Sequence, residues 1–180
     1  NTGGMGAYAP APIITKELQS RIDAEIIKPT LKQMRETDNN FIGCLYAGLI
    51  ITESGPKVIE FNCRFGDPET QVVLPILDGD FLQLLYSAAD GDVDKNSVKY
   101  SGGSSVCVVA ASKGYPDNYK KGLEISGLDL IDDEIIVYHS GTKKDKDKIM
   151  SNGGRVLGVT SVIKNYDLKF ARQKAYDAIK

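Results

Sequence analysis

The sequence contains no tryptophan, one histidine and three cysteines in 180 residues. A single histidine excludes any site that needs two of them, and the lack of a C-x-x-C pair argues against a structural zinc centre. The cysteines, Cys44, Cys63 and Cys107, are odd in number in a chain long enough to bury a core without cross-links. We therefore expect free thiols and a reducing, cytoplasmic compartment.

Long apolar runs and an excess of one charge are also missing. The longest apolar stretches, such as Val106 to Ala111, fall far short of the roughly 20 residues that span a bilayer. With 22 Lys and Arg against 24 Asp and Glu, the chain has no field that would gather nucleic acid or an anionic membrane. We expect neither partner. Because the chain starts at Asn1 without a methionine and stops at Lys180 within a predicted helix, we also expect a piece of something longer.

The first half of the chain reads as helices around one hairpin. Glycines and prolines predict a loop over 1–15, and apolar periodicity predicts a helix capped by Thr15 and kinked or restarted at Pro29. The remaining elements expected here are an antiparallel hairpin of strands 43–52 and 57–62 and two short helices, near 72–77 and 78–88.

The second half has a β character. The polar, glycine-flanked stretch Gly91–Gly103 predicts a domain boundary, which divides the chain into 1–95 and 96–180. Beyond it we expect strands over 106–111, 134–140 and 155–163 and a final helix capped by Asn165. The run 143–148 alternates lysine and aspartate and is expected to be a solvated loop.

The strongest chemical signal is the sequence from Val58 to Glu69. On a strand, side chains alternate between faces, so Glu60 and Asn62 should share one face with Val58, and Arg64 joins them if the strand persists that far. A carboxylate and an amide oxygen suit magnesium, and a guanidinium suits a transferring phosphoryl group. On this reading Ile59 and Phe61 pack against the body of the domain, and Cys63 is a packing residue.

A plain surface hairpin is the alternative for this motif. In that case Glu60 and Arg64 form an exposed ion pair and Asn62 begins a turn. The Gly-Asp-Pro-Glu loop that follows adds two carboxylates, Asp67 and Glu69, which repel one another unless a cation or an ammonium ligand offsets them. This neighbourhood favours a ligand site.

The glycine-rich opening is a second, weaker candidate. Asn1, Thr2, Gly3, Gly4, Met5 and Gly6 could form a backbone nest for an anion, although the composition alone favours a flexible connector. The segment lacks the lysine and the following helix of a P-loop. His139 is interpreted as a structural hydrogen-bonding residue.

Several segments together resemble one enzyme family. They are NTGGMGAYAPAP at 1–12, LYAGLI at 45–50, VIEFNCRFGDPETQ at 58–71, SKGYP at 112–116, HSGT at 139–142 and NGGRVLGVT at 152–160. In this order they closely resemble phosphoribosylamine–glycine ligase, also called glycinamide ribonucleotide synthetase, of the ATP-grasp superfamily. The resemblance implies an α+β fold: the later half of an ATP-grasp domain, an antiparallel sheet with helices, followed by a small β-rich C-terminal domain.

The resemblance also implies an activity. Such enzymes use ATP and Mg²⁺ or Mn²⁺ to join glycine to 5-phosphoribosylamine through glycyl phosphate, an early step of purine biosynthesis. By resemblance, Glu60 and Asn62 bind the metal and Arg64 stabilises the transition state. Asp67, Glu69 and the loop 1–6 border the glycine and phosphoribosylamine sites.

The same resemblance implies that an N-terminal half is missing and that the chain alone is inactive. Two alternatives stay open. Another ATP-grasp carboxylate–amine ligase would use the Glu-x-Asn-x-Arg pattern on a different carboxylate. A non-catalytic interaction module derived from a ligase would have no need to keep two metal ligands and the arginine side by side.

Overall fold

The computed structural model describes residues 2–180, which form two compact units. Unit 1 holds the chain up to Pro10, Asp67–Asp78 and Tyr100–Lys180, and unit 2 holds Ala11–Gly66 and Gly79–Lys99. The units are therefore interleaved along the chain, and the domain boundary near residue 95 stays a prediction. No helix among residues 2–180 is long and apolar enough to cross a membrane.

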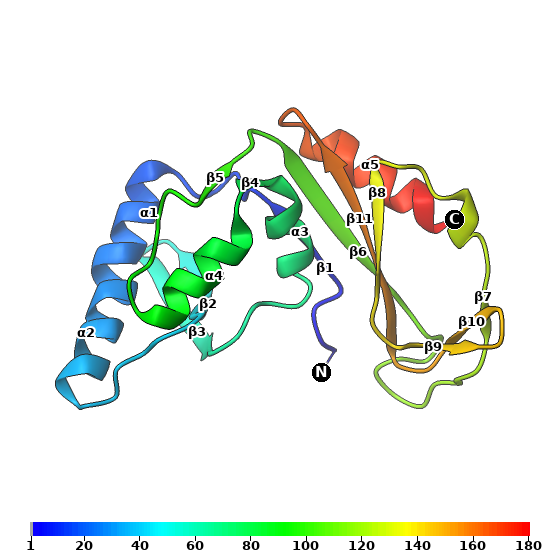
Figure 1. Ribbon diagram of the computed structural model, residues 1–180, viewed down its shortest axis with the longest axis horizontal. Coiled ribbons are helices and arrows are strands. Elements are labelled where there is room, and N and C mark those ends of the chain that lie inside the picture. Colours follow the sequence, from blue (N-terminus) through cyan, green and yellow to red (C-terminus); the bar gives the residue numbers. More distant parts are fainter. Residues whose placement is uncertain (1) are drawn as a thin grey trace. The chain divides into compact units, whose positions relative to one another are not determined.

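Unit 1 is built on a four-stranded antiparallel sheet (Figure 1). Its order is β1 (Gly6–Ala9), β6 (Ser104–Ala111), β11 (Arg155–Ile163) and β8 (Ile135–His139). The strands predicted at 106–111, 134–140 and 155–163 are confirmed. The loop predicted over 1–15 is wrong for β1, because β1 pairs with a strand almost one hundred residues away, which local composition does not reveal.

Two helices of unit 1 cover the sheet. Val106 packs with Ala171 and Ala175 of α5 (Leu168–Ile179), whereas the next residue, Cys107, packs with Val72 of α3 (Thr70–Val73). Because neighbouring strand residues face opposite sides, α5 and α3 lie on opposite faces. A short 3₁₀ turn, η2 (Leu74–Ile76), continues α3.

Two details of unit 1 differ from expectation. Helix α5 is capped by Asp167, whose Oδ1 accepts a hydrogen bond from the Phe170 amide at 2.9 Å, and not by Asn165. The run 143–148 is exposed, as expected, but it belongs to a hairpin rather than to a loop. The hairpin is formed by β9 (Thr142–Asp145) and β10 (Lys148–Ser151), and β7 (Glu124–Ile125) pairs with β10 to complete a small sheet. The turn η3 (Leu128–Leu130) follows β7 in the chain.

Unit 2 combines a long helical segment, a hairpin and a further helix. Thr15 caps α1 (Lys16–Ile22) by accepting from the Leu18 amide at 3.2 Å, as predicted. A π-helical turn, η1 (Asp23–Ile27), joins α1 to α2 (Lys28–Glu36), with Pro29 in the first turn of α2. Proline removes one backbone donor and crowds the preceding turn, which accounts for the break in α-helical hydrogen bonding.

The predicted hairpin of unit 2 is confirmed. Strands β2 (Tyr46–Thr52) and β3 (Gly55–Asn62) pair in antiparallel fashion. Helix α4 (Phe81–Asp90) begins at the Asp80 cap and ends at Gly91, whose φ of 85° is left-handed. A two-stranded ladder of β4 (Leu77–Gly79) and β5 (Val98–Tyr100) lies where the chain passes between the units.

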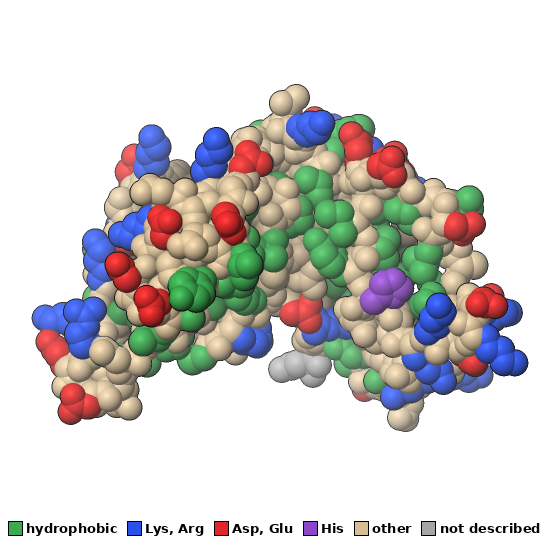
Figure 2. Space-filling model, viewed as in Figure 1, with side chains coloured by type: hydrophobic (Ala, Val, Ile, Leu, Met, Phe, Trp, Pro, Cys, Tyr) green, Lys and Arg blue, Asp and Glu red, His purple; other side chains and the backbone are tan. Residues whose placement is uncertain are grey.

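Unit 2 has a much smaller apolar core than unit 1. Among residues 2–180, the buried apolar side chains of unit 2 are Ile22, Ile26 and Pro56, whereas the three buried clusters all lie in unit 1. Apolar side chains are exposed instead, as the space-filling view illustrates (Figure 2). Those of the hairpin and the loop after it are Ile50, Val58, Ile59, Phe61 and Phe65.

We expect unit 2 to unfold before unit 1, because burying one large aliphatic side chain stabilises a fold by about 1.5–3 kcal/mol. In a Cys63→Ser background, Cys44 reports on unit 2 and Cys107 on unit 1. Burial raises the pKa of both thiols, which lowers their thiolate fraction at pH 8, and unfolding restores it. Thiol labelling across a urea series should modify Cys44 at a midpoint about 1 M or more below that of Cys107. Coincident midpoints would contradict this expectation.

Candidate active site

Glu60 and Asn62 lie together at the end of β3 in unit 2. Asn62 Nδ2 donates a hydrogen bond to Glu60 Oε1 at 2.9 Å, and Glu60 is exposed. Asn62 Oδ1 and Glu60 Oε2 take no part in that bond, so an amide oxygen and a carboxylate oxygen remain on two neighbouring side chains. The predicted juxtaposition of these two residues is therefore present.

The donor set of this pair suits magnesium. Residues 2–180 contain no cluster of three or more His, Cys, Asp or Glu side chains that could enclose a metal. Magnesium needs no such cluster, because one or two protein oxygens suffice when waters and substrate phosphates complete its octahedron. Glu60 and Asn62 would hold the ion, which would draw phosphate oxygens toward the hairpin when bound.

A β-bulge at Ile59 decides which way Glu60 points. Glu60 pairs with Gly48 and Val58 with Leu49, so Ile59 is the extra residue and the alternation of faces is interrupted there. Simple alternation predicted that Val58 shares the face of Glu60. This prediction is wrong, because the bulge places Val58 on the other face. The expected packing of Ile59 and Phe61 is wrong as well: they are 66% and 38% exposed, because few other side chains of unit 2 cover this hairpin.

Gly48 makes room for the Glu60 side chain, a role that the sequence reading missed. A Cβ atom at position 48 would lie 3.2 Å from Glu60 Cγ, closer than ordinary packing allows. Without that side chain, the carboxylate can lie across the neighbouring strand.

We expect Gly48→Ala in the full-length protein to shift the Glu60 side chain, because the new methyl group would lie 3.2 Å from Glu60 Cγ. The apparent affinity for Mg²⁺ should fall about tenfold, while the melting temperature stays near that of the parent. A titration of the protein with Mg²⁺ measures this affinity. The matched control is Gly43→Ala, at a position where a Cβ meets no atom within 4 Å; its φ of 132° strains alanine, so it should lower stability and leave the Mg²⁺ titration unchanged.

Arg64 lies beyond the end of β3, which stops at Asn62. Its Nη1 donates to the carbonyl oxygen of Phe65 at 2.9 Å, and no ion pair joins it to Glu60 in the described part of the chain. The strand therefore does not persist to Arg64, and the exposed Glu60–Arg64 pair of the plain-hairpin alternative is not formed. Cys63 is exposed, so the packing role expected for it is wrong.

Asp67 begins a second group of candidate residues, in unit 1. Its Oδ1 accepts from Gln71 Nε2 at 2.8 Å, and its Oδ2 accepts from Arg155 Nη2 at 2.7 Å. Two donors on different oxygens fix the orientation of the carboxylate. Glu69 is half-buried and immediately precedes α3.

The glycine-rich loop lies in the same group. The Gly3 amide donates to Tyr115 Oη at 3.0 Å, and the Gly4 carbonyl accepts from Arg155 Nη1 at 3.1 Å. Thr2, Met5 and Gly6 are exposed, and Asn1 lies outside the described residues. A loop held at two successive residues differs from the flexible connector that composition also allowed.

The candidate residues are divided between the two units. Glu60, Asn62 and Arg64 belong to unit 2, and Asp67, Glu69 and the loop 2–6 to unit 1. The sequence reading missed Arg155 and Tyr115. Both stand in segments that carry the family resemblance, NGGRVLGVT and SKGYP, but their contacts to the loop cross more than one hundred residues.

His139 has the structural role expected for it. Its Nδ1 lies 3.0 Å from Thr142 Oγ1, at the end of β8. The hydrogen bond joins the end of β8 to the start of β9, so it stabilises the turn between these strands.

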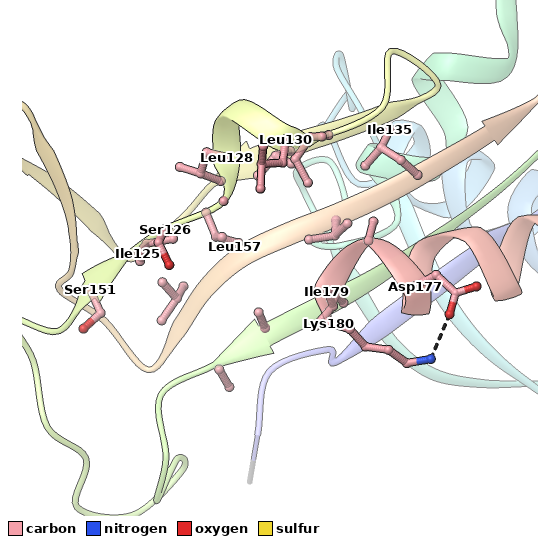
Figure 3. A pocket seen from close by; sticks show the side chains of 18 of the residues that line it. Ile125, Ser126, Leu128, Leu130, Ile135, Ser151, Leu157, Asp177, Ile179 and Lys180 are labelled. Atoms are coloured by element: carbon pink, nitrogen blue, oxygen red, sulfur yellow. Dashed lines mark hydrogen bonds and ion pairs between the residues drawn. The ribbon is translucent and has the colours of Figure 1, made fainter.

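Unit 1 also has a hollow of about 830 Å³ that none of the candidate residues lines. Leu128 and Leu130 of η3, Ile135 of β8 and Leu157 of β11 surround it (Figure 3). At the end of α5, Asp177 is paired with the ammonium of Lys180 at 2.8 Å. The lining is mostly apolar, and its carboxylates Glu124, Asp132 and Asp177 are paired with the ammonium groups of Lys148, Lys174 and Lys180. Because none of the candidate residues lines it, the hollow is not the candidate active site.

Residues 1–70 match a sequence model of an ATP-grasp domain, which places the chain in the ATP-grasp class. That model describes the phosphoribosylglycinamide synthetase ATP-grasp (A) domain, and residues 105–180 match the phosphoribosylglycinamide synthetase C domain. The chain belongs to the phosphoribosylglycinamide synthetase family.

Individual relatives agree with this family. The chain is 46% identical over 179 residues to phosphoribosylamine–glycine ligase of Caldanaerobacter subterraneus subsp. tengcongensis, covering 99% of this chain and 42% of the relative. It is 48% identical over 185 residues to that of Vigna unguiculata, covering 99% of this chain and 59% of the relative. The crystal structure of phosphoribosylamine–glycine ligase from Thermotoga maritima superposes with a TM-score of 0.83 at 31% identity, over 99% of this chain and 43% of that one. The chain thus spans about two fifths to three fifths of these proteins.

Proposed function

We propose that this chain is the C-terminal part of a ligase that joins glycine to 5-phosphoribosylamine with ATP, giving glycinamide ribonucleotide, ADP and phosphate. The observation that carries the proposal is the Glu60–Asn62 pair on β3, inside the segment that matches the family's ATP-grasp domain. A carboxylate and an amide oxygen are hard oxygen ligands, which suit a magnesium–nucleotide complex.

The proposed reaction has two steps. The γ-phosphoryl group of ATP passes to the glycine carboxylate, which gives glycyl phosphate and ADP. The amine of 5-phosphoribosylamine then attacks the carbonyl carbon, phosphate leaves and the amine loses a proton. Phosphoryl transfer depends mainly on positioning and on stabilising negative charge, so residues that bind and orient phosphate decide the rate.

The residues of this chain would divide the work as follows. Glu60 and Asn62 hold the magnesium ion, which supplies positive charge against the phosphate oxygens when bound. Arg64, a permanent cation, stabilises the charge that develops on the transferring phosphoryl group. Asp67, Glu69 and the loop 1–6 border the sites of glycine and 5-phosphoribosylamine.

An assay with defined substrates tests the proposal. The full-length protein should release phosphate from ATP only when glycine and 5-phosphoribosylamine are both present, and mass spectrometry should detect glycinamide ribonucleotide. Turnover with another carboxylate or amine in their place would indicate a different ATP-grasp ligase. Absence of any ligase turnover would favour an interaction module.

We expect the 180-residue chain alone to have no turnover under the same conditions. It spans only 42% of the Caldanaerobacter relative, and its ATP-grasp segment ends at residue 70. Half of a nucleotide cleft cannot exclude water from the phosphates or hold the adenine. Glycinamide ribonucleotide formed by the purified chain, with its mass verified, would contradict this expectation.

A further inference from the structure

Arg155 joins two loops that the proposed function places at the substrate sites. From the first residue of β11, its guanidinium donates to the carbonyl oxygens of Gly4 at 3.1 Å and Asp67 at 3.2 Å. The same group forms the 2.7 Å ion pair with the Asp67 carboxylate. One side chain therefore contacts the glycine-rich loop and the Gly-Asp-Pro-Glu loop at once.

The geometry uses the shape of the guanidinium as well as its charge. Three acceptors in two loops require a planar group with several donors in fixed directions, which arginine has and lysine lacks. The Arg155 side chain is 24% exposed, so its bonds are partly shielded from water. An exposed surface ion pair, by contrast, contributes little and fixes nothing.

The glycine-rich loop is packed closely on this arginine and its neighbours. A Cβ at Gly3 would lie 2.8 Å from Arg155 Cζ, and a Cβ at Gly4 would lie 2.5 Å from Pro68 Cδ. Tyr115 Oη accepts from the Gly3 amide on the same stretch of backbone. Gly3 and Gly4 therefore allow the backbone to lie close to side chains of unit 1. This role is separate from the anion nest that the sequence suggested.

We infer that Arg155 is a positioning residue of the ligase: it fixes the glycine-rich loop and the Asp67 carboxylate relative to one another. Arg155 acts through these loops, so the glycine and 5-phosphoribosylamine sites that they border depend on a residue from the C domain. The inference rests on the proposed function, which assigns substrates to the two loops. The contacts of Arg155 themselves all lie within unit 1.

The test compares Arg155→Lys, Arg155→Ala and Asp67→Asn in the full-length protein. Loss of the three-acceptor geometry should raise the KM of glycine or 5-phosphoribosylamine about tenfold to a hundredfold, with a smaller change for ATP. Arg155→Lys keeps the charge and should rescue little of the loss. Asp67→Asn leaves the two backbone acceptors of Arg155, the carbonyl oxygens of Gly4 and Asp67, in place. Its effect should therefore be milder than that of Arg155→Ala.

The matched control is Lys148→Ala, which breaks the 2.7 Å ion pair with Glu124 elsewhere in unit 1. It should leave all KM values unchanged. Hydrogen exchange in the 180-residue chain supplies a readout that does not depend on activity: Arg155→Lys should speed exchange in peptides covering residues 2–9, and Lys148→Ala should not.

The outcomes separate two kinds of failure. If the unmodified full-length protein does not form glycinamide ribonucleotide, the proposed function fails, and the role of Arg155 in it fails with it. If the protein is active but Arg155→Lys has wild-type KM values, or an unchanged exchange rate in residues 2–9, the positioning role is overturned while the function stands. A lower melting temperature with unchanged KM values would show a purely structural arginine.

Discussion

Glu60→Ala in the full-length ligase should lower kcat about a hundredfold or more at saturating ATP and Mg²⁺. Mutating residues that merely orient the ligands of a metal costs 10–100-fold in affinity or activity, so removing a ligand should cost at least as much. Glu60 is exposed, and within residues 2–180 Asn62 is the one side chain seen to donate a hydrogen bond to its carboxylate, so the loss should not arise from misfolding.

Glu60→Gln separates the effect of the negative charge from that of the side-chain oxygen. Glutamine keeps the size and one oxygen but removes the charge, so part of the lost activity should return at higher Mg²⁺ concentration. Glu53→Ala, in the exposed turn of the same hairpin, is the matched control and should leave the Mg²⁺ titration unchanged. Wild-type kcat and Mg²⁺ dependence in Glu60→Ala would exclude Glu60 as a metal ligand.

Local sequence patterns predicted the parts of the fold that depend on near neighbours. The hairpin of β2 and β3 is closed by a short turn, and the Thr15 cap depends on the amide three residues later. Both features depend on residues that are close together in the sequence. The same is true of the contact between Glu60 and Asn62. Such features can be read from one sequence because the interacting groups share a strand or a helical turn.

The features that were missed depend on contacts between distant segments. Strand β1 forms because Gly6 can lie against β6, where a Cβ would be 2.9 Å from the Cys107 carbonyl oxygen. Arg155 and Tyr115 reach the glycine-rich loop across more than one hundred residues. Local periodicity and motif spacing do not predict contacts between residues this far apart in the sequence.

The β-bulge shows how one residue alters a correct local prediction. A strict period of two places Val58 on the face of Glu60, but the additional residue Ile59 shifts the register by one position. The shift leaves Glu60 opposite Gly48, the one residue of β2 without a side chain that could obstruct it. The residue pair was therefore predictable, whereas the surroundings that direct its side chains were not.

Arg64→Ala should lower kcat of the full-length ligase about 10²–10³-fold, with KM values for the substrates changed much less. This pattern follows if the guanidinium stabilises charge that develops only in the transition state, because removing such a donor spares the ground state. The arginine is tied to its own loop by the bond from Nη1 to the Phe65 carbonyl, which orients the guanidinium before substrate binds.

Arg64→Lys and Lys57→Ala complete the design. Lysine keeps the positive charge without the fork of donors, so it should recover only part of kcat. Lys57 is an exposed cation on β3, the strand that precedes Arg64, and its removal should change neither kcat nor KM. A raised KM with unchanged kcat in Arg64→Ala would instead make the arginine a ground-state binding residue, since binding that is equal in substrate and transition state affects KM alone. The kcat–KM split therefore decides between the two roles.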